Sequence, residues 1–177
     1  MLIKKENLLI RCAEVSDVPL LGAWWRNSEL MAEWGYPEPF DITDEKITKQ
    51  VLSCSDDTFR ILIIEVDGKI SGEINLHNMG GKTVQIGINI CDFSLRNKGY
   101  GTKLLSMLVE NLFSQKDFSR IILEVNAENI PARRVYEKIG FAIKRIRNGN
   151  TIADYELIKE NFLLYNLKFV ADPPHSL

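Results

Sequence analysis

The stretch 95–102 constrains the fold of this chain more than any other, because it joins a predicted strand to a predicted helix through basic residues and two glycines. Upstream, isoleucine recurs at every second residue late in 84–90, which predicts a strand. Downstream, apolar residues recur at helical spacing in 104–113, which predicts an amphipathic helix. The first amides of a helix lack backbone partners and lie at the positive end of its dipole. The stretch therefore predicts a site for an anion such as a diphosphate.

The composition favours a single soluble domain. Of 177 residues, 45% are hydrophobic and 26% are charged, which is ordinary for a globular protein. We expect one domain at 1–170 and a disordered tail at 171–177. The net charge of -2 argues against a nucleic-acid partner. Three cysteines without a Cys-x-x-Cys pair, and only two histidines, argue against a metal site.

Hydropathy argues against a membrane partner. The longest apolar run, 61–64, is far shorter than the ~20 residues that span a bilayer. The first residues also lack the apolar stretch and cleavage site of a signal peptide. A cytoplasmic location is the resulting expectation.

Hydrophobic periodicity predicts an α/β fold of the α+β kind. The expected strands are 8–12, 59–66, 69–77, 84–90, 120–126, 141–147 and 151–157. Helices are expected to begin after the caps Ser16, Ser28, either Asp41 or Thr43, and Asn129, and one more follows 95–102. Asp67-Gly68 signals a hairpin, so the strands between 59 and 90 should form an antiparallel meander. A helix crosses over from 84–90 to 120–126, so these two strands should be parallel.

Two other phosphate-binding motifs are contradicted by their surroundings. Residues 80–83 (Gly-Gly-Lys-Thr) end like a P-loop, but the motif requires glycine where Leu76 stands, and a helix where a strand is predicted. Gly99 and Gly101 begin like a Rossmann fingerprint, but Leu104 replaces the third glycine and an antiparallel meander precedes it.

Two segments together carry a resemblance to a known family. The segment Arg96-x-x-Gly99-x-Gly101, after the strand 84–90, resembles the cofactor-binding signature of the GCN5-related N-acetyltransferases. The segment 129–141, Asn-x-x-Ala-x-x-x-Tyr-Glu-Lys-Ile-Gly-Phe, is similar to the second signature of that family. The resemblance covers roughly 8–158 and is closest to the branch of aminoglycoside 6'-, Rim-type and spermidine acetyltransferases.

The resemblance implies a mixed, mostly antiparallel sheet of six to seven strands, flanked by about four helices and splayed between 84–90 and 120–126. Acetyl-CoA, the implied co-substrate, would lie in the opening. Its pantetheine arm would pair with backbone groups of Ile88 and Ile90 and contact Asn129; a free strand edge independently suits a peptide-like ligand. The diphosphate would bind the anion site, which consists of Arg96, Asn97, Lys98, Gly99, Tyr100, Gly101 and Thr102.

The implied reaction is transfer of the acetyl group to an amine by direct attack in a ternary complex, without a metal. Tyr136, which the resemblance places near the thioester sulfur, is the predicted acid, because the usual pKa of a phenol, ~10, lies not far above that of a thiol, ~8.5. The base is left open. Many family members have glutamate where Gln85 stands, so Glu73 on the neighbouring strand is the predicted substitute. Glu33, Asp92 and a water chain are alternatives.

The acceptor is expected to contact the helical region after the first strand. Its aromatic and acidic residues suit a cationic amine, and the predicted contacts are Trp25, Glu33, Trp34 and Tyr36. The expected acceptor is a primary amine of a small cationic molecule or a protein N-terminus. The alternative function is a non-catalytic module that binds or senses acyl-CoA. Dimers are common among similar proteins, so a homodimer is one state to expect.

Overall fold

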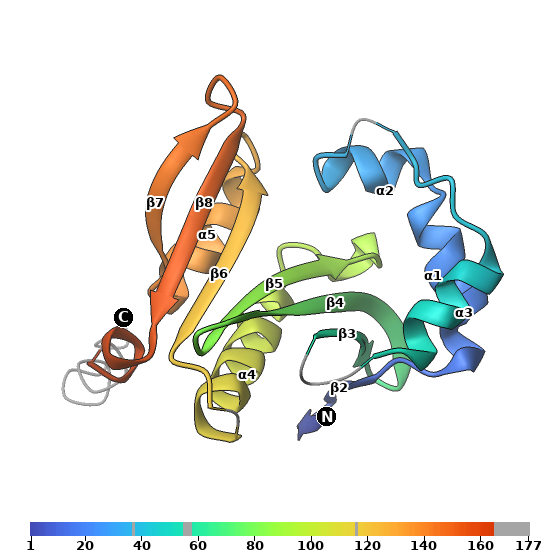
Figure 1. The fold of residues 1–177 in the computed structure, drawn as a ribbon, viewed down its shortest axis with the longest axis horizontal. Helices are drawn as coiled ribbons and strands as arrows, with labels where there is room; N and C mark the ends of the chain where they lie inside the picture. The colour runs from blue at the N-terminus through green and yellow to red at the C-terminus, as the bar shows by residue number, and fades with distance from the viewer. Residues whose placement is uncertain (37, 55–57, 116, 165–177) are drawn as a thin grey trace.

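The computed structural model describes residues 1–36, 38–54, 58–115 and 117–164 (Figure 1). Its strands are β1 (Leu2–Lys5), β2 (Leu8–Cys12), β3 (Phe59–Val66), β4 (Lys69–Gly80), β5 (Thr83–Ile90), β6 (Arg120–Asn126), β7 (Ala142–Arg147) and β8 (Ile152–Ile158). Its helices are η1 (Val15–Asp17), α1 (Val18–Trp25), α2 (Ser28–Glu33), α3 (Asp44–Leu52), η2 (Phe93–Leu95), α4 (Tyr100–Gln115) and α5 (Ile130–Ile139), and residues 159–164 are helical as well. The predicted tail at 171–177 lies outside the described residues.

All eight strands form one sheet, in the order β1-β2-β3-β4-β5-β6-β8-β7. Neighbouring strands are antiparallel except β5 and β6, which are parallel. The predicted fold class is therefore confirmed, with one strand more than expected. The additional strand is β1, which pairs with β2. Its four residues are too few to show a periodicity, which is why the sequence pattern did not reveal it.

The sheet divides where β5 meets β6. Only three residue pairs join these strands, and the last of them is Gln85 with Ile122. Beyond that point β5 continues against β4 alone, while β6 continues against β8 alone. Figure 1 shows the two halves diverging from their junction. The remainder of β5, residues 86–90, consequently has one edge that no strand covers.

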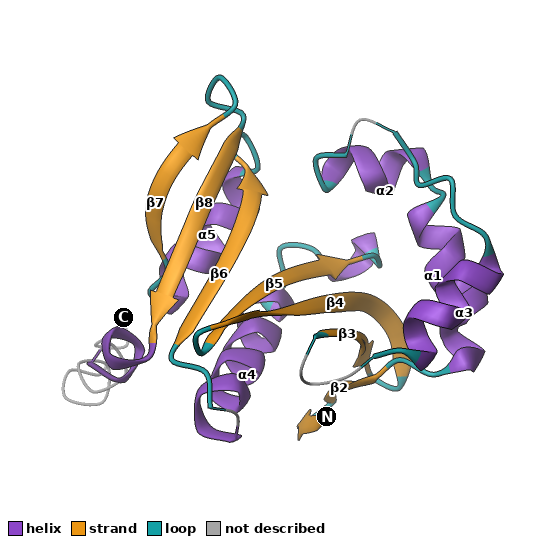
Figure 2. Ribbon diagram, viewed as in Figure 1, coloured by secondary structure: helices purple, strands orange, loops and turns teal. Residues whose placement is uncertain are grey.

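Two hydrophobic cores lie on opposite faces of the sheet. Alternation along β3 divides its side chains, so Leu62 and Ile64 pack into the core that α4 and α5 share, while Ile61 and Ile63 pack under α1 and α3. Figure 2 shows α1, α2 and α3 grouped at one side of the molecule and α4 and α5 against the sheet. The chain thus presents a separate group of helices on each face.

Two of the predicted helix starts are wrong by one or two residues. Ser16 was expected to cap the first α-helix, but it lies inside η1, and α1 begins only at Val18. Ser28 is the first residue of α2, and the cap is Asn27, whose side-chain oxygen accepts from the amide of Leu30 at 3.0 Å. Asn27 precedes Ser28 and satisfies the helix amide itself, whereas a capping box between Glu14 and Asp17 forms η1 and leaves Ser16 inside it.

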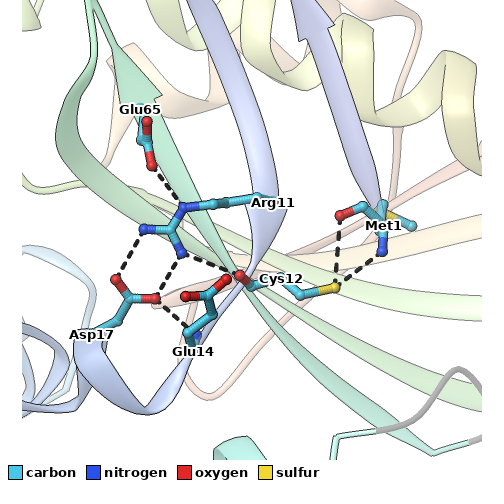
Figure 3. A network of polar contacts seen from close by, with 6 residues as sticks. All are labelled: Met1, Arg11, Cys12, Glu14, Asp17 and Glu65. Carbon is cyan, nitrogen blue, oxygen red and sulfur yellow. Dashed lines mark hydrogen bonds and ion pairs between the residues drawn. The ribbon is translucent and has the colours of Figure 1, made fainter.

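A network of ion pairs fixes the start of the helical region to the sheet (Figure 3). Arg11 on β2 donates to both carboxylate oxygens of Asp17, at 2.7 and 2.9 Å, and to Glu65 on β3 at 2.6 Å. Asp17 also accepts from the amide of Glu14 at 2.8 Å. Burial alone would raise the pKa of Asp17, but these hydrogen bonds outweigh it and hold the pKa below its usual value.

We expect Asp17→Asn to lower the free energy of unfolding at pH 7 by about 2 kcal/mol, less than the loss for a fully buried pair because Arg11 keeps Glu65. Because the folded-state pKa is depressed, the carboxylate stabilises the fold above its unfolded pKa, and this stabilisation is lost as the pH falls through the depressed value. Urea unfolding of both proteins should therefore show curves that converge under acid conditions. A difference that stays constant down to pH ~3 would contradict this account.

Candidate active site

The predicted anion site lies between η2 and α4. The first hydrogen bond of α4 runs from the amide of Lys103 to the carbonyl of Gly99 at 3.2 Å, so the amides of residues 100–102 have no carbonyl of the helix to bind. Gly99 has a φ of +81°, and a Cβ added there would meet no atom within 4 Å. The turn is therefore open in front of three free helix amides, which is the arrangement that a diphosphate requires.

The side chain of Arg96 bonds to another predicted site residue. Its guanidinium group pairs with both carboxylate oxygens of Glu33 on α2, with one of these distances at 2.9 Å, and its carbon lies 3.8 Å from the ring centre of Phe93. Arg96 was predicted to bind the cofactor, and Glu33 the acceptor. The ion pair thus ties the turn before α4 to the helical region that was predicted to shape the acceptor pocket.

The free edge of β5 lies next to this turn. Ile88 and Ile90 are half-buried and belong to the face that α4 covers. A Cβ added to Gly101 would lie 3.7 Å from Cδ1 of Ile90, so the end of β5 and the start of α4 are in contact.

Asn129 caps α5, and its side-chain oxygen accepts from the amide of Ala132 at 3.1 Å.

Tyr136 lies on α5, facing the same core. Its ring packs against Phe141 and Tyr155, with ring centres 6.0 and 5.8 Å away. Burial, with a smaller effect of Tyr155, raises the pKa of Tyr136 to about 12. The phenol therefore keeps its proton at neutral pH and has that proton to donate.

Glu73 lies on the opposite face of the sheet and is 1% exposed. It accepts from Nε1 of Trp25 at 2.9 Å, from Nδ2 of Asn89 at 3.2 Å and from Nδ2 of Asn75 at 3.4 Å. Burial raises the pKa of Glu73, although these three hydrogen bonds act against the rise. Glu73, the predicted base, is thus hydrogen-bonded inside the fold to Trp25, a predicted acceptor contact.

The other predicted acceptor contacts lie after α2. Trp34 is half-buried against the core under α1 and α3. Tyr36 is 46% exposed, and its ring meets that of Phe40 edge-on at 4.9 Å. Its pKa is raised by burial and by the nearby charges of Glu73 and Glu124. Tyr36 consequently lies close to carboxylates from both halves of the divided sheet.

The segment after α2 also reaches the far half of the sheet. A Cβ added to Gly35 would lie 3.7 Å from Cβ of Asn126, the last residue of β6. Glu124 on the same strand is exposed and forms an ion pair with Arg147 on β7 at 2.5 Å. The helical region therefore spans the opening between β5 and β6 on this face.

Sequence reasoning missed several polar residues of this face. Asn75, Asn89, Glu124 and Asn126 all follow the alternation of their strands, with side chains opposite to those in the apolar core. The signal that could have found them is strict polar alternation in strands whose other face is entirely apolar. Within the described ranges, no group of three or more His, Cys, Asp or Glu residues could hold a metal ion, and no helix is long and apolar enough to cross a membrane.

Comparison with known proteins agrees with this arrangement. A family model described as an acetyltransferase (GNAT) domain matches residues 7–142, so the chain belongs to this family. Among curated proteins, it is 24% identical over 140 residues to the prophage-derived uncharacterized N-acetyltransferase YokL of Bacillus subtilis, covering 77% of this chain and 76% of YokL. It is 28% identical over 150 residues to aminoglycoside N(6')-acetyltransferase type 1 of Klebsiella pneumoniae, covering 77% and 74%.

Solved structures show the same fold. The aminoglycoside acetyltransferase AAC(6')-Ib in complex with coenzyme A aligns with a TM-score of 0.74 at 21% identity, covering 90% of this chain and 99% of that one. Spermidine N-acetyltransferase from Vibrio cholerae in complex with CoA and spermine aligns with a TM-score of 0.76 at 20% identity, with the same coverage. The predicted family, enzyme class and co-substrate are thereby confirmed: the chain is an acetyl-CoA-dependent N-acetyltransferase.

The two glycines of the turn give a matched test of its geometry. Gly99→Ala places a side chain in a left-handed conformation, so we expect it to cost about 1–2 kcal/mol of unfolding free energy and to weaken coenzyme A binding. Gly101→Ala places a Cβ inside α4 at ordinary contact distance from its neighbours, so it should leave the unfolding free energy unchanged or raise it by up to about 1 kcal/mol. Chemical unfolding and calorimetric titration with coenzyme A measure both effects. Equal losses in the two variants would contradict the described turn.

Proposed function

We propose that this protein acetylates a primary amine of a small cationic molecule or of a protein N-terminus, by direct attack of the amine on acetyl-CoA in a ternary complex. One observation carries the proposal. The uncovered edge of β5 lies between the face of α4 and α5, which carries the anion site, and the opposite face, where Glu73, Asn75 and Asn89 lie. A donor and an acceptor entering from opposite faces can meet there without competing for space.

The donor side offers backbone groups in the places where a coenzyme needs them. The free amides of residues 100–102 would hold the diphosphate, and the uncovered edge at Ile88 and Ile90 would pair with the amides of the pantetheine arm. Acetyl-CoA supplies the activated acetyl group as a thioester. Asn97, Lys98 and Asn129 remain proposed contacts, and Arg96 would have to release Glu33 to reach a phosphate.

The chemistry assigns separate tasks to the two faces. The amine nitrogen forms a bond to the acetyl carbon as the carbon–sulfur bond breaks. A base removes a proton from the nitrogen, and Tyr136 gives its own proton to the sulfur of the leaving coenzyme. Alkyl amines titrate near ~10, so a base is needed at neutral pH. Glu73 is enclosed by three hydrogen-bond donors, whereas Glu124 is exposed. Glu124 lies on the face of the sheet opposite α4 and α5, which we call the acceptor face. We propose Glu124, or a water bound to it, as this base.

The amine class of the acceptor is supported by the residues of the helical region and by similar proteins. Tyr36 and Phe40 offer exposed aromatic rings beside carboxylates, which suits a cationic group. Proteins of the same fold have been solved with ribostamycin and with spermine, and another is a ribosomal L7/L12 alpha-N-protein acetyltransferase. A cytoplasmic location and a homodimer stay predictions.

A thiol-release assay with acetyl-CoA and a panel of polyamines, aminoglycosides and peptides tests the proposed function. We expect at least one primary amine to increase thiol release well above the rate without acceptor. Tight coenzyme A binding with no acceptor-dependent release from any member of the panel would favour the non-catalytic acyl-CoA-binding module.

The acid role of Tyr136 is tested by Tyr136→Phe, which keeps the ring and removes the proton. We expect kcat to fall by about 100-fold, the lower end of the range for a lost general acid. Tyr155→Phe is the matched control, because its hydroxyl bonds to Glu137 and Arg133 on the outer side of the same aromatic group. A kcat for Tyr136→Phe within about twofold of the wild type would exclude the acid role.

A further inference from the structure

A strip of polar side chains runs along β4 and β5 on the acceptor face. The facing pairs are Glu73 with Asn89, Asn75 with Gly87, and His77 with Gln85. On the other face, the same strands carry only apolar residues between these positions: Ile74, Leu76, Ile86 and Ile88. Central strands covered on both faces are ordinarily apolar on both. Within this strip Glu73 faces Trp25 and the ring of His77 packs against that of Phe59, whereas Asn75, Gly87 and Asn89 are only half-buried.

The charge in this strip has an unusual environment. Glu73 is buried, yet in the described part of the chain no Lys or Arg side chain forms an ion pair with it. Its three partners, Trp25, Asn75 and Asn89, are all neutral N–H donors. The carboxyl group is thus held by neutral donors, and it has no cationic partner among the described residues.

The hydrogen bonds of Glu73 determine how the two asparagines lie. A carboxylate only accepts, so it takes the N–H2 end of each amide and turns each Oδ1 away from itself. Within the described residues neither oxygen has a hydrogen-bond donor, and both side chains are only half-buried. Gly87, which lies opposite Asn75 on β5, adds no side chain to cover the strip, and a Cβ there would lie 4.0 Å from Cβ of Asn75.

We infer that Asn75 and Asn89 bind the reacting amine of the acceptor through their two Oδ1 atoms, and that Glu73 is the positioning residue that orients both. This inference rests on the proposed function and names how its acceptor is recognised. A free primary amine has two N–H donors and one lone pair. Two amide oxygens that accept both N–H groups leave the lone pair free to attack.

The arrangement also explains a preference for primary amines. A secondary amine offers one N–H to two acceptors, and a tertiary amine offers none, so one or both amide oxygens would be left without a donor.

Two readouts test this subsite, and the first does not need turnover. The side-chain amide signals of Asn75 and Asn89 in a ¹⁵N NMR spectrum are assigned by their loss in Asn75→Ala and Asn89→Ala. The coenzyme A complex is then titrated with ethylammonium and, separately, with tetramethylammonium, a cation without N–H donors. We expect ethylammonium alone to shift both signals, and Glu73→Gln to reduce the shifts, because only one oxygen then remains to accept from Trp25 and from both asparagine N–H2 groups.

The second readout uses the best acceptor found by thiol release. In Glu73→Gln we expect the acceptor KM to rise about tenfold, with kcat within threefold and the coenzyme A dissociation constant unchanged. Glu65→Gln, which removes a hydrogen-bonded carboxylate from β3, is the control and should leave the acceptor KM unchanged.

Equal shifts with both cations, ethylammonium shifts of undiminished size in Glu73→Gln, or an unchanged acceptor KM would each overturn the inference. Failure of every amine to release thiol would instead contradict the proposed function, and the NMR titration would still report on the subsite.

Discussion

The candidate site depends on one constraint in the sheet, namely that β5 and β6 stop pairing after three residues. Each half of the sheet is held independently of the other, because β5 pairs along its length with β4, and β6 pairs along its length with β8. The halves can therefore separate without losing their own ladders. The separation leaves the backbone groups on one edge of 86–90 without a strand, and such groups require water or a ligand. A coenzyme with peptide-like amides is a ligand of that kind.

Around this opening the two faces of the sheet have different chemistry. The face under α4 and α5 is apolar up to Ile88 and Ile90, and it ends at the free amides that begin α4. The face under α1 and α2 carries polar side chains, with Glu73 as a buried carboxylate. The Arg96–Glu33 ion pair joins the two sides, since it ties the turn before α4 to α2. Alternation along two strands is enough to separate an apolar side from a polar side.

Much of the fold could be predicted from local patterns. The hairpin at Asp67-Gly68, the crossover to β6 and the cap at Asn129 each depend on residues close together in sequence, and the structure has all three. The pairing of β1 could not be predicted, because four residues carry no periodicity. The helix caps were misplaced where Asn27 and Asp17 competed with the neighbouring serines.

The candidate site was less predictable, because its contacts join distant segments. The family signature indicated the turn at 95–102 and Tyr136, but nothing local shows that Arg96 bonds to Glu33, 63 residues away. The enclosure of Glu73 by Trp25 and two asparagines likewise depends on α1 packing over β4 and β5. A carboxylate in a strand pattern looks equally suited to act as a base or to position its neighbours, and only its partners distinguish these roles.

The central claim, that coenzyme A occupies the opening beside β5, is tested most directly by amide hydrogen exchange with and without coenzyme A. Without ligand, the amides of 87–90 that face the opening and the amides of 100–102 should exchange rapidly. Saturation with coenzyme A should slow both groups by about tenfold or more and leave β2 and β3 unchanged. Calorimetric binding of coenzyme A without any protection at these residues would contradict the account.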